Sequence, residues 1–240
     1  MELAGVSAPV PFSARVTDVD YPGTAMEPVA VLPLPLDADP EAACAPIAGE
    51  SPVARALRAV LPPVVRRVVV AVTATHVDVV TGLVGPLGAE VTAVDPALDW
   101  GRTVRVALEH LDARSHTSIL VHDWRHPLVP VEVTERVVAA LADGHEVVVP
   151  VVAMTDSVKE LDVDGSVIAT VDRSRLSVAQ YPRGFAAGRL VDLLDRGSDL
   201  LAAAVAGDPP VRIVDGHADA TRFTLPADAA FLEAIIATRL

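Results

Sequence analysis

Short β-branched segments alternate with longer segments of helical period from residue 28 to the end of the chain. Strands that are rich in Val, Ile and Leu throughout are typical of a parallel sheet that is buried on both faces. Because this alternation is the pattern of strand–helix–strand units, it predicts a Rossmann-like α/β fold with helices on both faces of a mostly parallel sheet. The predicted strands are Val29–Leu34, Arg67–Thr73, Ala89–Val94, Ser118–His122, Glu146–Val152 and Val211–Val214.

Helical segments lie between and after these strands. Ser51 directly precedes Pro52, an order that favours a helix start because serine caps the first turn and proline suits its first position. Glycines follow several helical segments and mark their ends. The predicted helices are Pro52–Val60, Val77–Val84, Arg102–Ala113, Glu132–Ala142, Phe185–Leu194, Asp199–Ala206 and Ala227–Ala237.

The pattern changes after Val152, where two alternating segments are joined around Asp164-Gly165. An Asp-Gly pair between alternating segments is a strong hairpin signal. We therefore expect a β-hairpin arm at about residues 155–181 that projects from the sheet. Residues 1–27, which proline and glycine interrupt, are interpreted as an N-terminal extension, and residues 28–240 as one domain.

The charge balance restricts the classes of partner. The chain has 32 acidic and 19 basic residues, a formal net charge of −13, which opposes binding to nucleic acid or an anionic membrane. The longest apolar stretch, Val68–Val94, contains His76, Asp78 and Glu90 and is not a continuous membrane span. One cysteine excludes an intrachain disulfide, and we expect a cytoplasmic protein.

Two loops beyond predicted strands are rich in polar residues. One is VHDWRHP, residues 121–127, and the other is VDGHADATRFTLPAD, residues 214–228. Ligands of open parallel sheets bind beyond the carboxyl ends of the strands, which favours these loops as a site. Asp123 at a strand end is suited to bind Mg²⁺ or a hydroxyl, although it could equally cap the loop.

Five blocks of the chain stand out together: VHDWRHP, PVVAMTDSVK, Thr170 to Arg173, QYPRGF and ATRFTLPAD. In this order they resemble the 2-C-methyl-D-erythritol 4-phosphate (MEP) cytidylyltransferase family. VHDWRHP matches its His-Asp-x-x-Arg-Pro loop, and PVVAMTDSVK matches Pro-x-x-Asp-Thr-x-Lys. Thr170 to Arg173 matches Thr-Val-Asp-Arg, and QYPRGF matches Gln-Thr-Pro-Gln-Gly-Phe. ATRFTLPAD matches the closing Asn-x-Lys-x-Thr-x-x-Glu-Asp block. The resemblance covers residues 29 to 240.

The resemblance implies a nucleotidyltransferase fold and a reaction of isoprenoid precursor synthesis. In that reaction CMP passes from CTP to the phosphate of MEP, a sugar-alcohol phosphate, and pyrophosphate is released. Mg²⁺ is the implied cofactor. The implied assembly is a homodimer in which each arm completes the neighbour's site.

The resemblance also implies roles for individual residues. Asp123 and Arg222 fall on catalytic positions, and Asp123 is in addition the implied metal ligand. The implied substrate-binding residues are Arg173, Ser198, Thr224 and Arg125, and the implied nucleotide-binding residues are Gly101 and Thr103. Purely structural roles are the alternatives. Arg222 could be a salt-bridged loop residue, Arg173 a solvated surface residue, and Thr103 a hydrogen-bonding residue at a helix start.

The family's first phosphate-binding loop is missing. An Ala-Ala-Gly-x-Gly-x-Arg loop followed by Pro-Lys would supply backbone N–H groups and two cations, whereas this chain reads VLPLPLDADPEAACAPIAGESPV. No lysine or arginine lies between Arg15 and Arg55. Proline provides no N–H donor, and the acidic residues there repel phosphate. Those acidic residues are Asp37, Asp39 and Glu41.

Four further positions depart from the family. His126 replaces the arginine of the first block, Tyr181 a threonine, Ala220 an asparagine and Trp100 an arginine. Two functions follow as alternatives: a cytidylyltransferase with weakened or lost activity, and a non-catalytic binding homologue that dimerises through the arm. Transfer from a different activated donor is a third possibility that no residue specifies.

Overall fold

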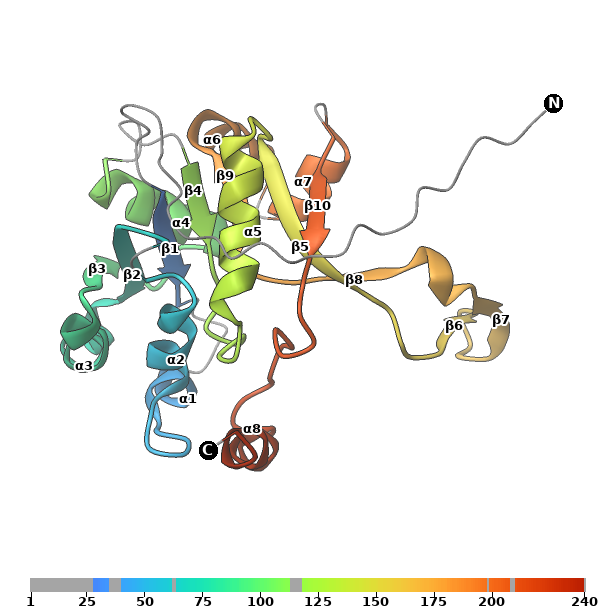
Figure 1. Ribbon diagram of the computed structural model, residues 1–240, viewed down its shortest axis with the longest axis horizontal. Coiled ribbons are helices and arrows are strands. Elements are labelled where there is room, and N and C mark those ends of the chain that lie inside the picture. The colour runs from blue at the N-terminus through green and yellow to red at the C-terminus, as the bar shows by residue number, and fades with distance from the viewer. Residues whose placement is uncertain are drawn as a thin grey trace, which may run out of the picture.

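The computed structural model describes residues 28–34, 40–61, 64–112, 118–197, 199–207 and 210–239. A twisted sheet forms the centre of the molecule, with the strand order β10-β5-β9-β4-β1-β2-β3 and β8 paired to β5 (Figure 1). The strands are β1 (Val29–Pro33), β2 (Arg67–Thr73), β3 (Glu90–Val94), β4 (Ser118–Val121), β5 (Val147–Ala153), β8 (Ser177–Ala179), β9 (Arg183–Ala186) and β10 (Arg212–Asp215).

Four of the seven strand pairs in the central sheet are parallel, so this sheet is mostly parallel, as predicted. β1 lies between β2 and β4, and all three run in the same direction, as do β2 with β3 and β5 with β10. β9 is antiparallel to both of its neighbours, β4 and β5. The prediction of a helix from Phe185 is wrong at its start, because Phe185 and Ala186 belong to β9 and the helix begins at Ala187.

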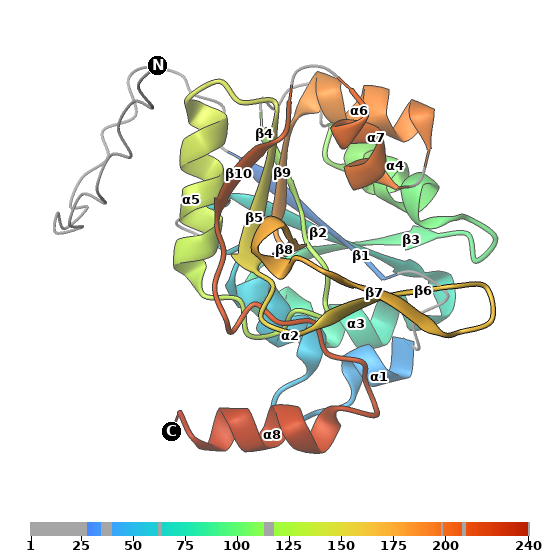
Figure 2. The same cartoon turned by 90° about the vertical axis from the view of Figure 1, so that its right-hand side faces the viewer.

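Helices cover both faces of the sheet (Figure 2). Alternate residues of one strand enter two separate cores: Ala30 and Leu32 pack toward one face, and Val29 and Val31 toward the other. This alternation follows from the two-residue period of a strand. The first face is covered by α2 (Pro52–Arg58), α3 (Val77–Val84) and α5 (Val131–Ala142), and the second by α4 (Trp100–His110), α6 (Ala187–Arg196) and α7 (Leu200–Val205).

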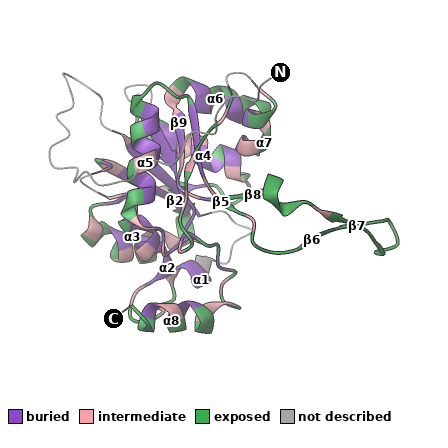
Figure 3. Cartoon of the chain, turned by 45° about the vertical axis from the view of Figure 1, so that its right-hand side comes forward, coloured by how far each residue is buried: buried purple, intermediate pink, exposed green. Residues whose placement is uncertain are grey.

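The predicted arm is present as a separate two-stranded sheet of β6 (Val158–Leu161) and β7 (Val167–Val171). Its turn contains Gly165 at a φ of +83°, a conformation that suits glycine. The hairpin extends away from the body, and its residues are almost all exposed (Figure 3). Exposed apolar side chains are unusual on a free hairpin of a monomer, and the arm carries Leu161, Val163, Val167 and Ile168.

Two short helices lie near the ends of the described chain. α1 (Pro40–Cys44) follows β1, and α8 (Ala229–Ala237) packs through Leu232 and Ile236 against Phe223. Among the described residues, no helix is long and apolar enough to cross a membrane. The predicted extension, residues 1–27, lies outside the described residues.

Candidate functional site

The loop at residues 121–127 begins where β4 ends, at the carboxyl edge of the parallel strands. The backbone N–H of His122 still donates to the Val31 carbonyl of β1 at 2.9 Å, so the sheet fixes the position of the next residue. That residue is Asp123, which is only 7% exposed. The structure therefore places its carboxylate at the edge where ligands of open α/β sheets bind.

Arg125 folds back onto Asp123. Its backbone N–H and Nε donate to Asp123 Oδ1 at 2.9 and 3.0 Å, and its Nε and Nη2 donate to Oδ2 at 3.1 and 2.8 Å. Burial alone would raise the pKa of Asp123, but the hydrogen bonds and charge of Arg125 outweigh burial, and the pKa is lowered. Asp123 is therefore an ionised carboxylate in an internal ion pair.

Two buried histidines flank this ion pair. His122 is fully buried, and its two ring nitrogens have no hydrogen-bond partner of good geometry among the described residues. Burial lowers the pKa of His122 to about 3, with a smaller contribution from His126. Burial also lowers the pKa of His126. Both rings are therefore neutral at pH 7, and His126 does not replace the cation of the arginine that the family has at this position.

The second predicted loop lies against the first. His126 Nδ1 is 2.9 Å from the carbonyl oxygen of Ala220, and the Phe223 N–H donates to the Arg125 carbonyl at 2.8 Å. These two bonds bring together segments that are far apart in the sequence. Arg222 lies between their attachment points, is exposed, and makes no hydrogen bond or ion pair within the described chain. Its guanidinium is thus available to a ligand.

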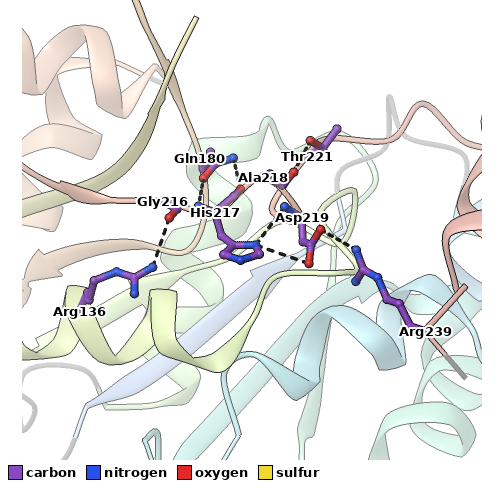
Figure 4. Close-up of polar contacts among 8 residues, drawn as sticks. All are labelled: Arg136, Gln180, Gly216, His217, Ala218, Asp219, Thr221 and Arg239. Carbon is purple, nitrogen blue, oxygen red and sulfur yellow. Dashed lines mark hydrogen bonds and ion pairs between the residues drawn. The ribbon is translucent and has the colours of Figure 1, made fainter. Parts of the chain in front are cut away.

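Gln180 fixes the start of this second loop (Figure 4). Its amide Nε2 donates to the His217 carbonyl at 2.9 Å, and its Oε1 accepts from the His217 N–H at 3.0 Å. A Cβ on Gly216 would lie 2.0 Å from Gln180 Oε1 and 3.0 Å from the Val151 carbonyl, so only glycine fits there. Arg136 of α5 adds a bond from Nε to the Asp215 carbonyl at 2.7 Å. The loop that carries Arg222 is thus held from two elements.

Tyr181 and Arg183 complete the cluster. The Tyr181 ring lies 5.1 Å from the His126 ring and 6.4 Å from the His122 ring, centroid to centroid. The Arg183 guanidinium carbon lies 4.3 Å from the Tyr181 ring centroid, a cation–π geometry. Arg183 was not predicted as a site residue, although the QYPRGF block places an arginine where the family has glutamine.

Gly101 and Thr103 lie at the start of α4, beyond the carboxyl end of β3. Both are buried, and the Thr103 N–H donates to the Asp99 carbonyl at 2.9 Å, which is a helix-start contact. Gly101 lines a hollow between α4 and α6. β3 is three places from β4 in the sheet, roughly 14 Å away at ordinary strand spacing. Their role in binding a nucleotide stays a prediction.

Two of the other three predicted substrate residues are described, and each makes a hydrogen bond within the chain. Arg173 lies in the arm, where its Nη1 donates to the Thr155 carbonyl. Thr224 is exposed, and its N–H donates to Asp228 Oδ2 at 2.6 Å. Ser198 lies outside the described residues.

The segment that replaces the family's first phosphate-binding loop is described only in part. Residues 35–39, including Asp37 and Asp39, lie outside the described residues, and Glu41 lies in α1. Trp100 is partly buried and packs against the core on the α4 face of the sheet.

A protein-held Mg²⁺ at Asp123 does not fit this arrangement. A carboxylate offers about four acceptor positions, and three N–H groups of Arg125 already donate to both of its oxygens, the Nε–H being shared between them. In the described part of the chain, no group of three or more His, Cys, Asp or Glu residues could hold a metal ion. Asp123 as a metal ligand stays a prediction that requires Arg125 to move away.

Comparison with known protein families gives a direct match. The family model "IspD: 2-C-methyl-D-erythritol 4-phosphate cytidylyltransferase" matches residues 36–238. A relative of that name from Saccharopolyspora erythraea is 35% identical over 225 residues, which cover 89% of this chain and 98% of the relative. Another from Frankia casuarinae is 37% identical over 181 residues, 72% of this chain but only 65% of the relative.

Solved structures agree with the sequence comparisons. A crystal structure of 4-diphosphocytidyl-2C-methyl-D-erythritol synthase superposes with a TM-score of 0.72 at 26% identity, covering 88% of this chain and 99% of that one. The 2-C-methyl-D-erythritol 4-phosphate cytidylyltransferase of Thermus thermophilus gives 0.67 at 25% identity, covering 88% and 98%.

Proposed function

Because this chain belongs to the 2-C-methyl-D-erythritol 4-phosphate cytidylyltransferase family, we propose that it transfers CMP from CTP to MEP and releases pyrophosphate, at a reduced rate. The observation that carries this proposal is the junction of the two polar loops at the carboxyl edge of β4. It places the exposed Arg222 next to the loop of Asp123 and Arg125. Arg222 and Asp123 fall on functional positions of the family, and Arg125 lies one residue before the position of the family's loop arginine.

The roles of these residues follow from their charges. In nucleotidyl transfer, negative charge develops on the oxygens of the phosphorus that is attacked, and a fixed cation stabilises it. Arg222, which has no partner within the described chain, is the cation suited to this role, and the Gln180 contacts hold its loop in place. Asp123 holds the guanidinium of Arg125 in place through their ion pair.

The reduced rate follows from the missing first loop. No lysine or arginine lies between Arg15 and Arg55, so the two cations of the family's loop have no counterpart there, and Pro33 and Pro35 provide no N–H donor. Removing one preorganised donor typically costs about 10²- to 10³-fold in rate. The loss of several donors predicts turnover that is several orders of magnitude slower than in members with the intact loop.

A pyrophosphate-release assay with CTP, MEP and Mg²⁺ tests the proposal, since family members typically use a divalent metal. We expect slow release above a buffer control at high enzyme concentration. Arg222→Gln should lower it by at least about 10²-fold. The matched control is Arg212→Gln, which removes an exposed guanidinium from the opposite end of the sheet, at the start of β10, and should leave the rate unchanged. Absence of release by the unaltered chain would overturn the proposal.

The alternative function is a non-catalytic homologue that binds through the same fold and dimerises through its arm. The ion pair between Asp123 and Arg125 favours this alternative, because the carboxylate already binds a partner inside the chain. Calorimetry with CTP separates the two functions. Tight, Mg²⁺-dependent binding of CTP together with pyrophosphate release excludes the non-catalytic function, whereas dimerisation without either supports it.

A further inference from the structure

Arg183 is a cation without a counter-ion in the described part of the chain, and it lies at the carboxyl edge of the sheet. It is the first residue of β9 and lies opposite Val121, the last residue of β4. Its guanidinium lies over the Tyr181 ring and makes no ion pair with the described residues. Its Nε is buried and has no hydrogen-bond partner in that part of the chain. Buried guanidinium nitrogens are normally paired, so this one requires an explanation.

The surroundings of Arg183 are polar and fixed. Its positive charge acts on both the Tyr181 hydroxyl and the His126 ring, and so does the charge of Arg125. The two guanidinium groups therefore flank the same two rings. Asp123 neutralises Arg125, so the charge of Arg183 is left over among these three residues. Asp199 is the other acidic residue whose charge acts on Tyr181, and its effect is the smallest. Asp199 is engaged at the start of α7, where it accepts from the Leu201 and Ala202 N–H groups.

From this geometry we propose that Arg183, held over the Tyr181 ring, binds a phosphate group of a phosphate ester. A guanidinium offers a planar set of donors that matches two phosphate oxygens. The contact with the Tyr181 ring restricts the motion of the guanidinium, which reduces the entropy lost on binding. This inference rests on the proposed function for its two candidate ligands, the triphosphate of CTP and the monophosphate of MEP.

The position of Arg183 also relates it to the missing loop. β9 is two places from β1 in the sheet, roughly 10 Å away at ordinary strand spacing, and both reach the same edge. A phosphate chain can span that distance. Arg183 thus provides a positive charge on the other side of β4 from the end of β1. In this site the cation comes from a guanidinium, whereas both oxygens of Asp123 already accept from Arg125.

Isothermal titration calorimetry tests the inference without requiring turnover. The full chain is titrated in EDTA with CTP, with MEP and with cytidine, which has no phosphate. We expect Arg183→Gln to weaken the binding of at least one phosphate ester by roughly tenfold to a hundredfold and to leave cytidine unaffected. The ester that loses affinity identifies the source of the phosphate. Arg183→Lys keeps the charge without the planar fork and should retain part of the affinity.

Arg212→Gln serves as the matched control, because it removes one exposed guanidinium far from this edge and changes the net charge equally. Thermal unfolding of each variant shows whether it is folded; if Arg183→Gln is not, the comparison is made with Arg183→Lys and Tyr181→Leu, which should both weaken binding. Unchanged affinity of the folded variants for both esters, or no ester binding by the unaltered chain in EDTA, would overturn the inference. Ester binding that depends on Arg183 in a chain that releases no pyrophosphate would leave the inference standing and refute the proposed function.

Discussion

At the scale of single residues, the position of one arginine decides whether the loop after β4 offers a cation to a ligand. The family carries its arginine three residues after the aspartate, whereas Arg125 lies two residues after Asp123. At that spacing both its backbone N–H and its side chain reach the same carboxylate. His126, at the family's arginine position, turns inward to the Ala220 carbonyl. A displacement by one residue thus converts a cation for the ligand into an internal ion pair.

The buried histidines predict a dependence of stability on pH. The pKa of His122 is lowered to about 3 in the folded chain, against an ordinary value of 6.5. The unfolded chain therefore binds more protons between pH 6.5 and about 3, and the free energy of unfolding falls as the pH falls through this range. His126, whose pKa is also lowered, acts in the same direction. Each histidine contributes a slope of up to about 1.4 kcal/mol per pH unit.

Urea unfolding at pH 7, 6 and 5 measures this slope. We expect His122→Phe to reduce it by about one proton, because phenylalanine has a similar shape and does not titrate. His145→Phe is the control, because His145 is an exposed residue just after α5. This variant should have the same slope as the unaltered chain. Equal slopes in all three chains would show that His122 does not resist protonation when folded.

At the scale of elements, the sequence was sufficient for the parallel strands and most helices. β2 and α3 have the predicted bounds, because their apolar runs end at residues that suit loops. β9 was missed, since Pro182 and Gly184 disfavour a strand and its pairing with β4 and β5 is visible only in three dimensions. The resemblance to the cytidylyltransferase family was confirmed because it rests on five ordered blocks.

The meeting of the two polar loops was predictable from the sequence, whereas their detailed contacts were less so. The rule that ligands bind beyond the strand ends led to the two loops, and these loops do meet. The pairing of Arg125 with Asp123 was not foreseen, because sequence spacing alone does not tell which way a loop side chain turns. Arg183 was overlooked for the related reason that its strand was not recognised.

Gly184 explains how α5 packs against β9. A Cβ at this position would lie 2.5 Å from Val137 Cγ1 and 2.8 Å from Leu141 Cδ1, both on α5. We expect Gly184→Ala to lower the free energy of unfolding by about 1–3 kcal/mol through overpacking. Gly188→Ala on α6 is the control, because a Cβ there meets no atom within 4 Å. It should be neutral or stabilising by up to about 1 kcal/mol in chemical denaturation. If both variants changed the free energy of unfolding equally, the close packing of α5 on Gly184 would be refuted.

At the scale of the whole molecule, the arm predicts self-association. Its exposed apolar residues extend beyond the body, where a second chain could cover them. We expect the unaltered chain to sediment as a dimer at micromolar concentration and the double variant Leu161→Glu, Ile168→Glu to sediment as a monomer. The control is Val79→Glu, Val205→Glu, which places the same charges at exposed apolar positions on α3 and α7. A monomeric unaltered chain would refute the prediction.

The place of β9 in the sheet has a consequence for how the chain is made. Residues 183–186 join β4 to β5, yet they follow both strands in the sequence. On a ribosome, β1 to β4 can assemble in order of synthesis, but β5 has no partner in that assembly until the arm has been synthesised and β9 has emerged. At about 5–20 residues per second, the roughly thirty residues between β5 and β9 correspond to a delay of a few seconds. During that interval the apolar edge of β5 is a natural substrate for chaperones.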